Sequence, residues 1–450
     1  MASNASSSGR LPSTTTNVVL PYRMHVSQKY LDLTRRKLEL TRLPREQRSR
    51  QPARWSFGIA KAELEPLVDH WVERYDWRAQ EAHYNNALPQ YRTVAQGTRL
   101  HYVHKRSTSP NAIPLIFVHG GLPESFIGIH HMIDSLTDPI KTPPRGSDNT
   151  PSFHVIAPSI PGSGFSDVVT EAENNVASTA ELFDALMKSL GYTTYIATGS
   201  GWGFNICRLM ALVHSESCLA IHTANPDLPD PRRSYDHAQQ PTSMPASPSQ
   251  SPYGISPPLT PGSPLSIPER PQTVAYALCD SPTGLLAYIM DAIQPTSSDS
   301  PTSSFRNSAE SQSVRTPTSL IDWCMLYWLP GPEVALRWLM NSAPVVPELW
   351  RSYSQVPLAI SHFGSHEQPN SGARWAESYH RVLLFRSRSG SVRFPAWERP
   401  AEMVADIREL AGLLAQDMYG GFAVSPPGSM GPPQTVPLPS DIGHPLGRGY

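Results

Sequence analysis

The sequence lacks the features that mark several classes of protein. Only four of its 450 residues are cysteines, and no two are spaced as CxxC, which argues against a zinc site or a disulfide framework. The formal net charge is −1, so nothing in the charge favours a nucleic-acid partner. No run reaches 18 apolar residues, and residues 1–20 lack the apolar core of a signal peptide. We therefore expect a cytoplasmic protein without a membrane span, metal or cofactor, and of unknown oligomeric state.

Proline, by contrast, is abundant, at 47 residues, and is concentrated in a few segments. Residues 228–268 and 295–316 consist largely of proline, serine and other small or polar residues. Such a composition cannot form a packed core. We interpret both segments as insertions into a folded domain.

The two insertions lead to a first testable prediction. Because they are too rich in proline and serine to pack, proteases should cut the chain there before they cut elsewhere in the folded part. Limited proteolysis followed by mass spectrometry of the fragments tests this. Cleavage inside the sheet domain while both insertions stay intact would show that these boundaries are wrong.

Buried strands alternate with helices along much of the chain. Continuous apolar runs, typical of parallel strands covered on both faces, occur at 114–119, 153–157, 219–223, 358–363 and 381–385. Helical patterns occur between and after them, including 182–190 and 400–414, and two apolar helical segments, 274–293 and 320–341, lie beside the insertions. This alternation predicts an α/β fold with a parallel sheet and an inserted helical cap.

The composition divides the chain into six parts. We expect a disordered tail, an N-terminal meander domain, the first half of the α/β core, a helical cap that contains both insertions, the second half of the core and a flexible C-terminal tail. Their boundaries are 1–20, 21–110, 111–227, 228–355, 356–416 and 417–450.

Residues 195–204 have the pattern of a nucleophile elbow. A short strand-like run ends at a glycine cluster, and an apolar helix follows. In such an elbow a sharp turn presents one side chain above the sheet, with small residues two before and two after it. Gly199 and Gly203 are the residues that fit this spacing, so the nucleophile position is Gly201. Glycine has no side chain that could attack a substrate.

Two other interpretations of the elbow remain open. Ser200 could be a serine nucleophile, but its flanking residues would then be Thr198 and Trp202, and tryptophan is too large for the contact between strand and helix. The glycines at 199, 201 and 203 also partly resemble a dinucleotide-binding loop. No acidic residue lies about twenty positions further on, however, as that loop would require.

Several motifs occur in an order that resembles one known family. They lie at 25–27 (His-Val-Ser), 75–81, 119–120 (His-Gly), 161–166 (Pro-Gly-Ser-Gly-Phe-Ser), 271–285, 327–329 and 394–400. From about Pro21 to Leu414 the chain is similar to the α/β-hydrolase-fold epoxide hydrolases of the microsomal and juvenile-hormone type. The resemblance implies an α/β-hydrolase fold with an inserted helical cap and an N-terminal meander. It also implies an apolar small-molecule ligand.

The same resemblance implies a catalytic aspartate and histidine, and both positions are substituted here. The family's aspartate nucleophile corresponds to Gly201 and its base histidine to Arg393. Arginine keeps its proton and cannot act as a base. The family's two cap tyrosines fall at about Ser263 and at Leu339, and Glu367 is the candidate for its acid. The standard covalent mechanism is therefore expected to be absent.

Further positions follow from the resemblance. The oxyanion turn would be formed by His119, Gly120, Gly121 and Trp202, although the turn has one extra residue and lacks the family's tryptophan. The residues expected to line the substrate pocket are Phe126, Trp328, Leu339 and Phe394. We also expect Arg393 and Glu367 to form a close ion pair that replaces the former proton relay, because a buried guanidinium needs a partner.

Other residues have both a structural and a functional interpretation. His119, His362 and His366 could be bases or ligands, but they lack the carboxylates or cysteines of a metal site and are expected to be structural. Asp167 is interpreted as a loop cap and Asp322 as a solvated helix start. The aromatic residues of the cap could pack the cap, line a pocket or both; they are Trp323, Tyr327, Trp328 and Trp338.

Three functional hypotheses follow. The first is an enzyme that still binds an apolar epoxide, or a related molecule, and acts by polarisation or acid catalysis. The second is a pseudoenzyme that serves as a binding or partner protein. The third is an ordinary epoxide hydrolase whose catalytic residues lie at other positions than those assigned above.

Overall fold

The structure is a computed structural model of the chain, and it describes residues 18–45, 58–142, 150–169, 173–229, 231, 268, 270–293, 316–364, 375–390 and 392–417. Glu367, His366, Ser263 and nearly all of both insertions lie outside these residues, as do 1–17 and 418–450. Within the described part, no helix is long and apolar enough to cross a membrane.

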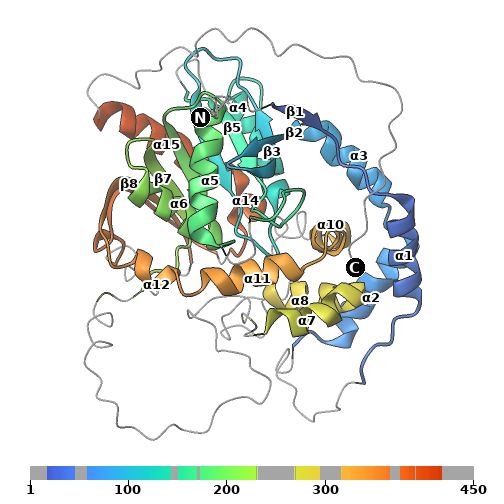
Figure 1. The fold of residues 1–450 in the computed structure, drawn as a ribbon. Coiled ribbons are helices and arrows are strands. Elements are labelled where there is room, and N and C mark those ends of the chain that lie inside the picture. The colour runs from blue at the N-terminus through green and yellow to red at the C-terminus, as the bar shows by residue number, and fades with distance from the viewer. Residues whose placement is uncertain are drawn as a thin grey trace, which may run out of the picture.

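One mixed sheet organises the molecule (Figure 1). In the described part it has nine strands in the order β1-β2-β3-β5-β4-β6-β7-β8-β9. The neighbouring strands β5, β4, β6, β7, β8 and β9 are parallel to one another, and the pairs β1–β2, β2–β3 and β3–β5 are antiparallel. The strand bounds are β1 Leu20–Tyr22, β2 Gln90–Ala95, β3 Thr98–Lys105, β4 Ile113–Val118, β5 Phe153–Pro158, β6 Tyr195–Gly199, β7 Cys218–Ala224, β8 Ser354–Phe363 and β9 His380–Arg388.

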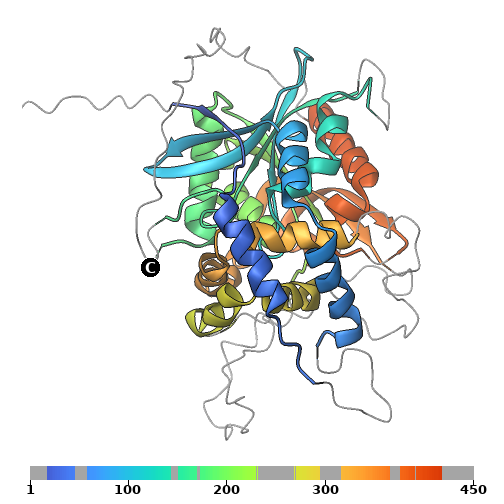
Figure 2. The same cartoon turned by 90° about the vertical axis from the view of Figure 1, so that its right-hand side faces the viewer.

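Helices cover both faces of the sheet. Helices α5 (Val176–Ser189) and α6 (Trp202–Val213) lie on one face, and α15 (Pro400–Asp417) lies on the other (Figures 1 and 2). The central strands are buried on both sides, which explains why β4 and β6 are apolar without alternation. The short elements η1 (Phe126–His131), α4 (Ile133–Thr137) and α14 (Pro395–Glu398) complete the core.

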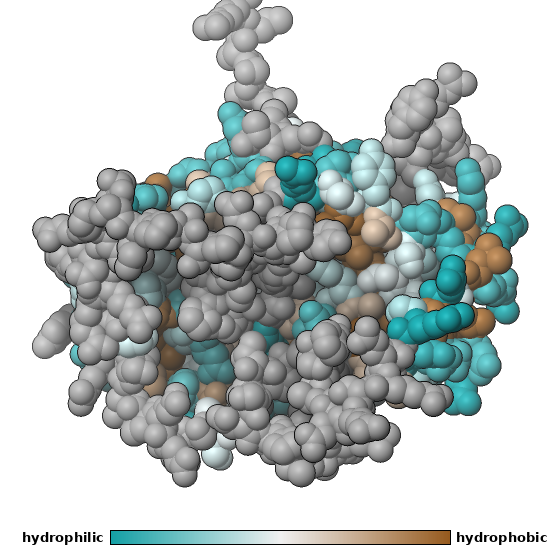
Figure 3. Space-filling model, turned by 90° about the horizontal axis from the view of Figure 1, so that it is seen from below, coloured by the Kyte–Doolittle hydropathy of each residue, from teal (hydrophilic) through white to brown (hydrophobic). Residues whose placement is uncertain are grey.

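A second layer of helices lies below the sheet in Figure 1. It contains α7 (Pro271–Asp280), α8 (Pro282–Ile293), α10 (Pro317–Trp328), α11 (Glu333–Ser342) and α12 (Val346–Leu349). The N-terminal helices α1 (Gln28–Glu39) and α2 (Lys61–Glu73) pack against this layer, and α3 (Trp77–Ala87) follows them. From below, the hydrophobic residues of the described part lie in separate areas among hydrophilic ones (Figure 3).

Three details differ from the sequence-based expectations. The segments 274–293 and 320–341 are not single helices but pairs, broken before Pro282 and at residues 329–332, because proline cannot continue a helix. Helix α5 begins at Val176, ahead of the helical pattern expected at 182–190, and is capped by Asn175, whose side chain accepts from the amides of residues 177 and 178. Leu20, which we assigned to the tail, is the first residue of β1.

Asp322 corrects another expectation, because it is buried rather than solvated. It is 2% exposed in α10, and its two carboxylate oxygens accept from the hydroxyls of Tyr75 (2.7 Å) and Tyr84 (2.8 Å). Burial raises the pKa of Asp322 from 3.8 to about 6. Between these values the folded state keeps a proton that the unfolded state loses. This group therefore lowers stability as the pH rises from about 4 to about 6.

Candidate functional site

The elbow has the backbone geometry that the glycine spacing predicts. Strand β6 ends at Gly199, helix α6 begins at Trp202, and the turn residue Gly201 has φ 55° and ψ −126°. A Cβ on Gly199 would lie 2.8 Å from the backbone of Gly203, and a Cβ on Gly203 would lie 2.2 Å from the carbonyl oxygen of Val118. Both flanking glycines are therefore required for the close contact between strand and helix.

Gly201 itself differs from these two glycines, because it has room for a side chain. A Cβ there would meet nothing closer than Gly120, at 4.0 Å, and the residue is exposed between the partly buried Ser200 and Trp202. Its positive φ is a conformation that side chains adopt only at some cost in energy. The elbow therefore keeps the shape that presents a nucleophile and lacks the nucleophile.

Ser200 is turned toward the neighbouring strand. Its Oγ accepts a hydrogen bond from the amide of Ala224, at the end of β7, at 3.3 Å. The left-handed turn conformation falls on Gly201 and not on Ser200. This geometry favours a structural role for the Ser200 hydroxyl.

His119 holds the predicted oxyanion turn together. Its ring is 1% exposed, and its two nitrogens face the amides of Gly121 (3.2 Å) and Ile160 (3.1 Å). Burial lowers the pKa of His119 to about 3, so the ring is neutral at ordinary pH. The turn lies next to the elbow, because a Cβ on Gly121 would be 3.9 Å from Cβ of Trp202. The contacts of His119 within the turn indicate a structural role for its ring.

Glu124 is a site residue that the sequence analysis did not identify. Its Oε2 accepts a hydrogen bond from the amide of Gly120 at 2.8 Å. One of the amides expected to donate to a substrate oxyanion therefore already donates to a carboxyl group of the protein. A Cβ on Gly120 would lie only 2.3 Å from this oxygen, so the glycine makes room for the carboxyl group. The hydroxyl of Tyr327, from α10 in the cap, donates to the carbonyl oxygen of Glu124.

The surroundings of Glu124 keep its carboxyl group close to half protonation at neutral pH. Burial raises the pKa of Glu124 to about 7, and the negative charge of Glu398 acts in the same direction. The Gly120 amide and the positive charge of Arg393 act against it. The residue is only partly buried as a whole, so it lies deep among protein atoms and still has an accessible surface.

Arg393 lies in a loop whose backbone is fixed by a buried carboxylate. Oε1 of Glu398 accepts from the amides of Arg393 (2.9 Å) and Phe394 (2.7 Å), and Glu398 is 7% exposed. The positive charge of Arg393 acts on the Glu124 carboxyl group and lowers its pKa. Because Glu367 lies outside the described residues, the Arg393–Glu367 pair stays a prediction.

The residues expected to line the substrate pocket serve different packing roles. Phe126 is fully buried against the ring of His101, and Phe394 packs edge-on against Trp323. Leu339 is 1% exposed. Trp328 contacts the N-terminal unit, because its Nε1 donates to the hydroxyl of Thr34 on α1 at 2.8 Å.

The aromatic contact between cap and elbow involves a different pair. The rings of Trp202, at the start of α6, and Trp338, in cap helix α11, meet edge-on with centroids 5.6 Å apart. The indole nitrogen of Trp338 donates to Thr179 in α5 at 3.0 Å. The cap is thereby held directly against the first residue after Gly201.

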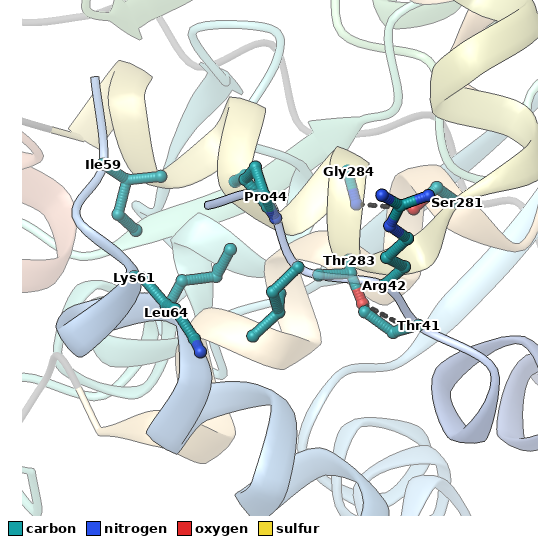
Figure 4. Close-up of a pocket in the computed structure, with 11 residues that line it drawn as sticks. Thr41, Arg42, Pro44, Ile59, Lys61, Leu64, Ser281, Thr283 and Gly284 are labelled. Atoms are coloured by element: carbon teal, nitrogen blue, oxygen red, sulfur yellow. Dashed lines mark hydrogen bonds between the residues drawn. The ribbon is translucent and has the colours of Figure 1, made fainter. Parts of the chain in front are cut away.

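A cavity lies away from the elbow, between the N-terminal unit and the cap (Figure 4). It has a volume of about 310 Å³ and is lined mainly by residues of the α1–α2 connection and of α8. Its lining residues include the apolar Leu43 and Leu64 and the charged Arg42 and Lys61. None of the residues described above lines this cavity, which is therefore separate from the elbow. In the described part no group of three or more His, Cys, Asp or Glu side chains is arranged to hold a metal ion.

Comparison with known families agrees with this architecture. Residues 19–129 match the family described as Epoxide hydrolase N terminus, and residues 113–246 match the family described as alpha/beta hydrolase fold. The chain therefore has an α/β-hydrolase fold with a mixed sheet.

Individual proteins match over nearly the whole chain. A putative epoxide hydrolase of Stigmatella aurantiaca is 32% identical over 408 residues, which cover 87% of this chain and 84% of that protein. Juvenile hormone epoxide hydrolase 1 of Ctenocephalides felis is 27% identical over 428 residues, covering 89% and 85%. The crystal structure of the Bombyx mori juvenile hormone epoxide hydrolase has a TM-score of 0.67 at 21% identity, covering 89% of this chain and 95% of that one. The Aspergillus niger epoxide hydrolase structure has a TM-score of 0.65 at 22% identity, covering 90% and 98%.

Proposed function

The chain belongs to the epoxide hydrolase family of the α/β-hydrolase fold, and from this we propose that it binds, and acts slowly on, an apolar epoxide or a related small molecule. The binding place would be the elbow beneath the cap, which we assign to residues 228–355. The proposal excludes the covalent aspartyl ester, because the residue at the turn is Gly201.

The observation that supports the proposal most directly is the preserved but empty elbow. Gly201 keeps the strained turn conformation, is exposed and has room for a side chain. The first amides of α6 lie next to it, and the start of a helix favours partial negative charge, such as that on an opening epoxide oxygen. These features support binding and polarisation of an epoxide at a turn that lacks the nucleophile.

The alternatives meet different obstacles. An ordinary epoxide hydrolase would need a nucleophile at the turn, and the positive φ falls on Gly201. A pseudoenzyme used only for binding is favoured by one observation: the amides of Gly120 and Gly121 already have acceptors within the protein. The slow enzyme is preferred because a titratable carboxyl group, Glu124, lies at the same place.

Turnover of a simple epoxide tests the proposal. The purified protein should bind styrene oxide but convert it to the diol more slowly than about 1 s⁻¹, which is the low end for ordinary enzymes. In heavy-oxygen water the label should enter the diol without first entering a protein carboxylate, because no ester forms. Faster turnover, or label in a carboxylate, would contradict the missing mechanism, and absence of binding would contradict the proposed ligand.

A further inference from the structure

We propose that Glu124 is the catalytic acid of this site and that its carboxyl group donates a proton to the oxygen of an epoxide bound above Gly201. The inference rests on the proposed function and goes beyond it by naming the reacting group. In this role the Glu124 carboxyl group takes the place of an amide hydrogen-bond donor in an oxyanion turn, and unlike the amide it can transfer its proton.

The position of the carboxyl group is the first support. Gly120 lies between Glu124 and Gly201: its amide donates to Oε2 of Glu124 at 2.8 Å, and a Cβ on Gly201 would lie 4.0 Å from its Cα. Glu124 is therefore beside the exposed turn, in the region where an α/β-hydrolase places the developing oxyanion.

The second support is that Glu124 is held from two independent directions. The Gly120 amide fixes one carboxyl oxygen, and the cap residue Tyr327 donates to the backbone carbonyl of Glu124. Tyr327 is 1% exposed, so this contact ties the acid to the cap. A proton donor needs such fixed geometry relative to its acceptor.

The third support is the charge around the carboxyl group. Arg393 and Glu398, from the loop after β9, act on it with opposite signs, and His119 and Tyr327 are held neutral by burial. The pKa of Glu124 is raised to about 7, so a large fraction carries the proton at neutral pH. An acid with this pKa combines a protonated ground state with a useful tendency to transfer the proton.

The reaction balances without a further reactant. The proton moves from Glu124 to the epoxide oxygen as the carbon–oxygen bond of the ring breaks and its electron pair stays on that oxygen. A water oxygen forms the new bond to the carbon, and the proton that this water loses returns to the Glu124 carboxylate. The products are a vicinal diol and the regenerated acid.

Kinetics of Glu124→Gln with styrene oxide test the inference, with Asp322→Asn as the matched control. Asp322 is also a buried acid with a raised pKa, but it lies between α10 and the N-terminal tyrosines rather than at the elbow. Glu124→Gln should lower kcat/KM by about 100-fold, the low end for general acid catalysis, and leave styrene oxide binding within about twofold by NMR saturation transfer. Asp322→Asn should leave both unchanged.

The pH profile separates a proton donor from a structural residue. The kcat/KM of the unchanged protein should fall as the pH rises through about 7, because the acid must be protonated, and Glu124→Gln should remove this dependence. Infrared difference spectra should show the protonated carboxyl band of Glu124 disappearing over the same range.

The possible results distinguish a failure of the acid role of Glu124 from a failure of the proposed function. If styrene oxide binds but Glu124→Gln keeps the full rate and pH profile, or the rate rises with pH, Glu124 is not the acid and the proposed function still stands. If styrene oxide binds and no diol forms at any pH, both the acid role of Glu124 and the slow turnover are contradicted, and only the binding part of the proposed function stands. If styrene oxide does not bind the folded protein, the proposed function itself fails.

Discussion

The double variant Gly201→Asp, Arg393→His is expected to hydrolyse styrene oxide at least about 100-fold faster than the unchanged protein, because it supplies a nucleophile and a base together. The space at residue 201 accepts a side chain, and the elbow already has the required backbone shape. At residue 393 the backbone amide is fixed by Glu398, and exchanging the side chain leaves that hydrogen bond in place.

The single variants separate the two steps of the covalent mechanism. Gly201→Asp alone should attack the epoxide and stop at the ester, which intact-protein mass spectrometry would detect as one added substrate. Arg393→His alone should form no ester, because residue 201 is still glycine. A double variant with asparagine at residue 201 and histidine at 393 is the matched control, since an amide cannot form the ester.

The aspartate itself should lower stability by about 1–3 kcal/mol, because it would adopt the strained turn conformation. Circular dichroism therefore has to show that each variant is folded. If folded Gly201→Asp forms no adduct and the double variant gains no rate, residue 201 is not the nucleophile position.

Arg208→Met is expected to lower the free energy of unfolding by about 3 kcal/mol or more, since buried acceptors that lose their donor cost about 1–3 kcal/mol each. Arg208 in α6 is fully buried and donates to the carbonyl oxygens of Leu349 (2.8 Å) and Ser352 (2.7 Å). It also donates to Nε2 of His380. Burial lowers its pKa only to about 10, so the guanidinium stays charged at neutral pH.

This arginine joins the elbow helix to the segment that returns the chain from the cap to β8. Its guanidinium lies over the ring of Trp350 at 4.3 Å, within that segment. Urea unfolding followed by tryptophan fluorescence measures the loss. Arg351→Met is the matched control, because Arg351 is exposed and pairs with the exposed Glu348 three residues before it, so its loss should cost less than about 1 kcal/mol. Equal stability of the two variants would show that the Arg208 contacts contribute little.

The elbow could be predicted from the sequence because its geometry depends on glycines at fixed spacing. Only glycine fits at 199 and 203, where a Cβ would collide with backbone atoms, so the spacing itself encodes the contact. The parallel strands were predictable for a similar reason, since burial on both faces requires continuous apolar runs.

Glu124 could not be recognised in the same way. Its role depends on the fold bringing Gly120, Tyr327 and the loop of Arg393 around one carboxyl group, and the latter two are distant in sequence. The only local signal is an acidic residue in a turn otherwise made of small and apolar residues.

Asp322 was misjudged because it was treated as a helix start. It lies within α10, in a run that is apolar around most of the helix, and a single acid among such residues indicates a buried partner rather than solvent. The breaks in the cap helices had a clearer signal, the prolines at 282 and 332, which a helix accepts only in its first turn.

The hydrogen bonds of Asp322 constrain the order in which the chain can fold during synthesis. Its partners Tyr75 and Tyr84 precede it by 247 and 238 residues. Contacts across such separations close late, because the entropy of a long loop must be overcome first. Helices α2 and α3 therefore wait, with part of their packing surface uncovered, until the ribosome has made α10. In this protein the N-terminal unit is therefore made before the cap helix that completes its packing.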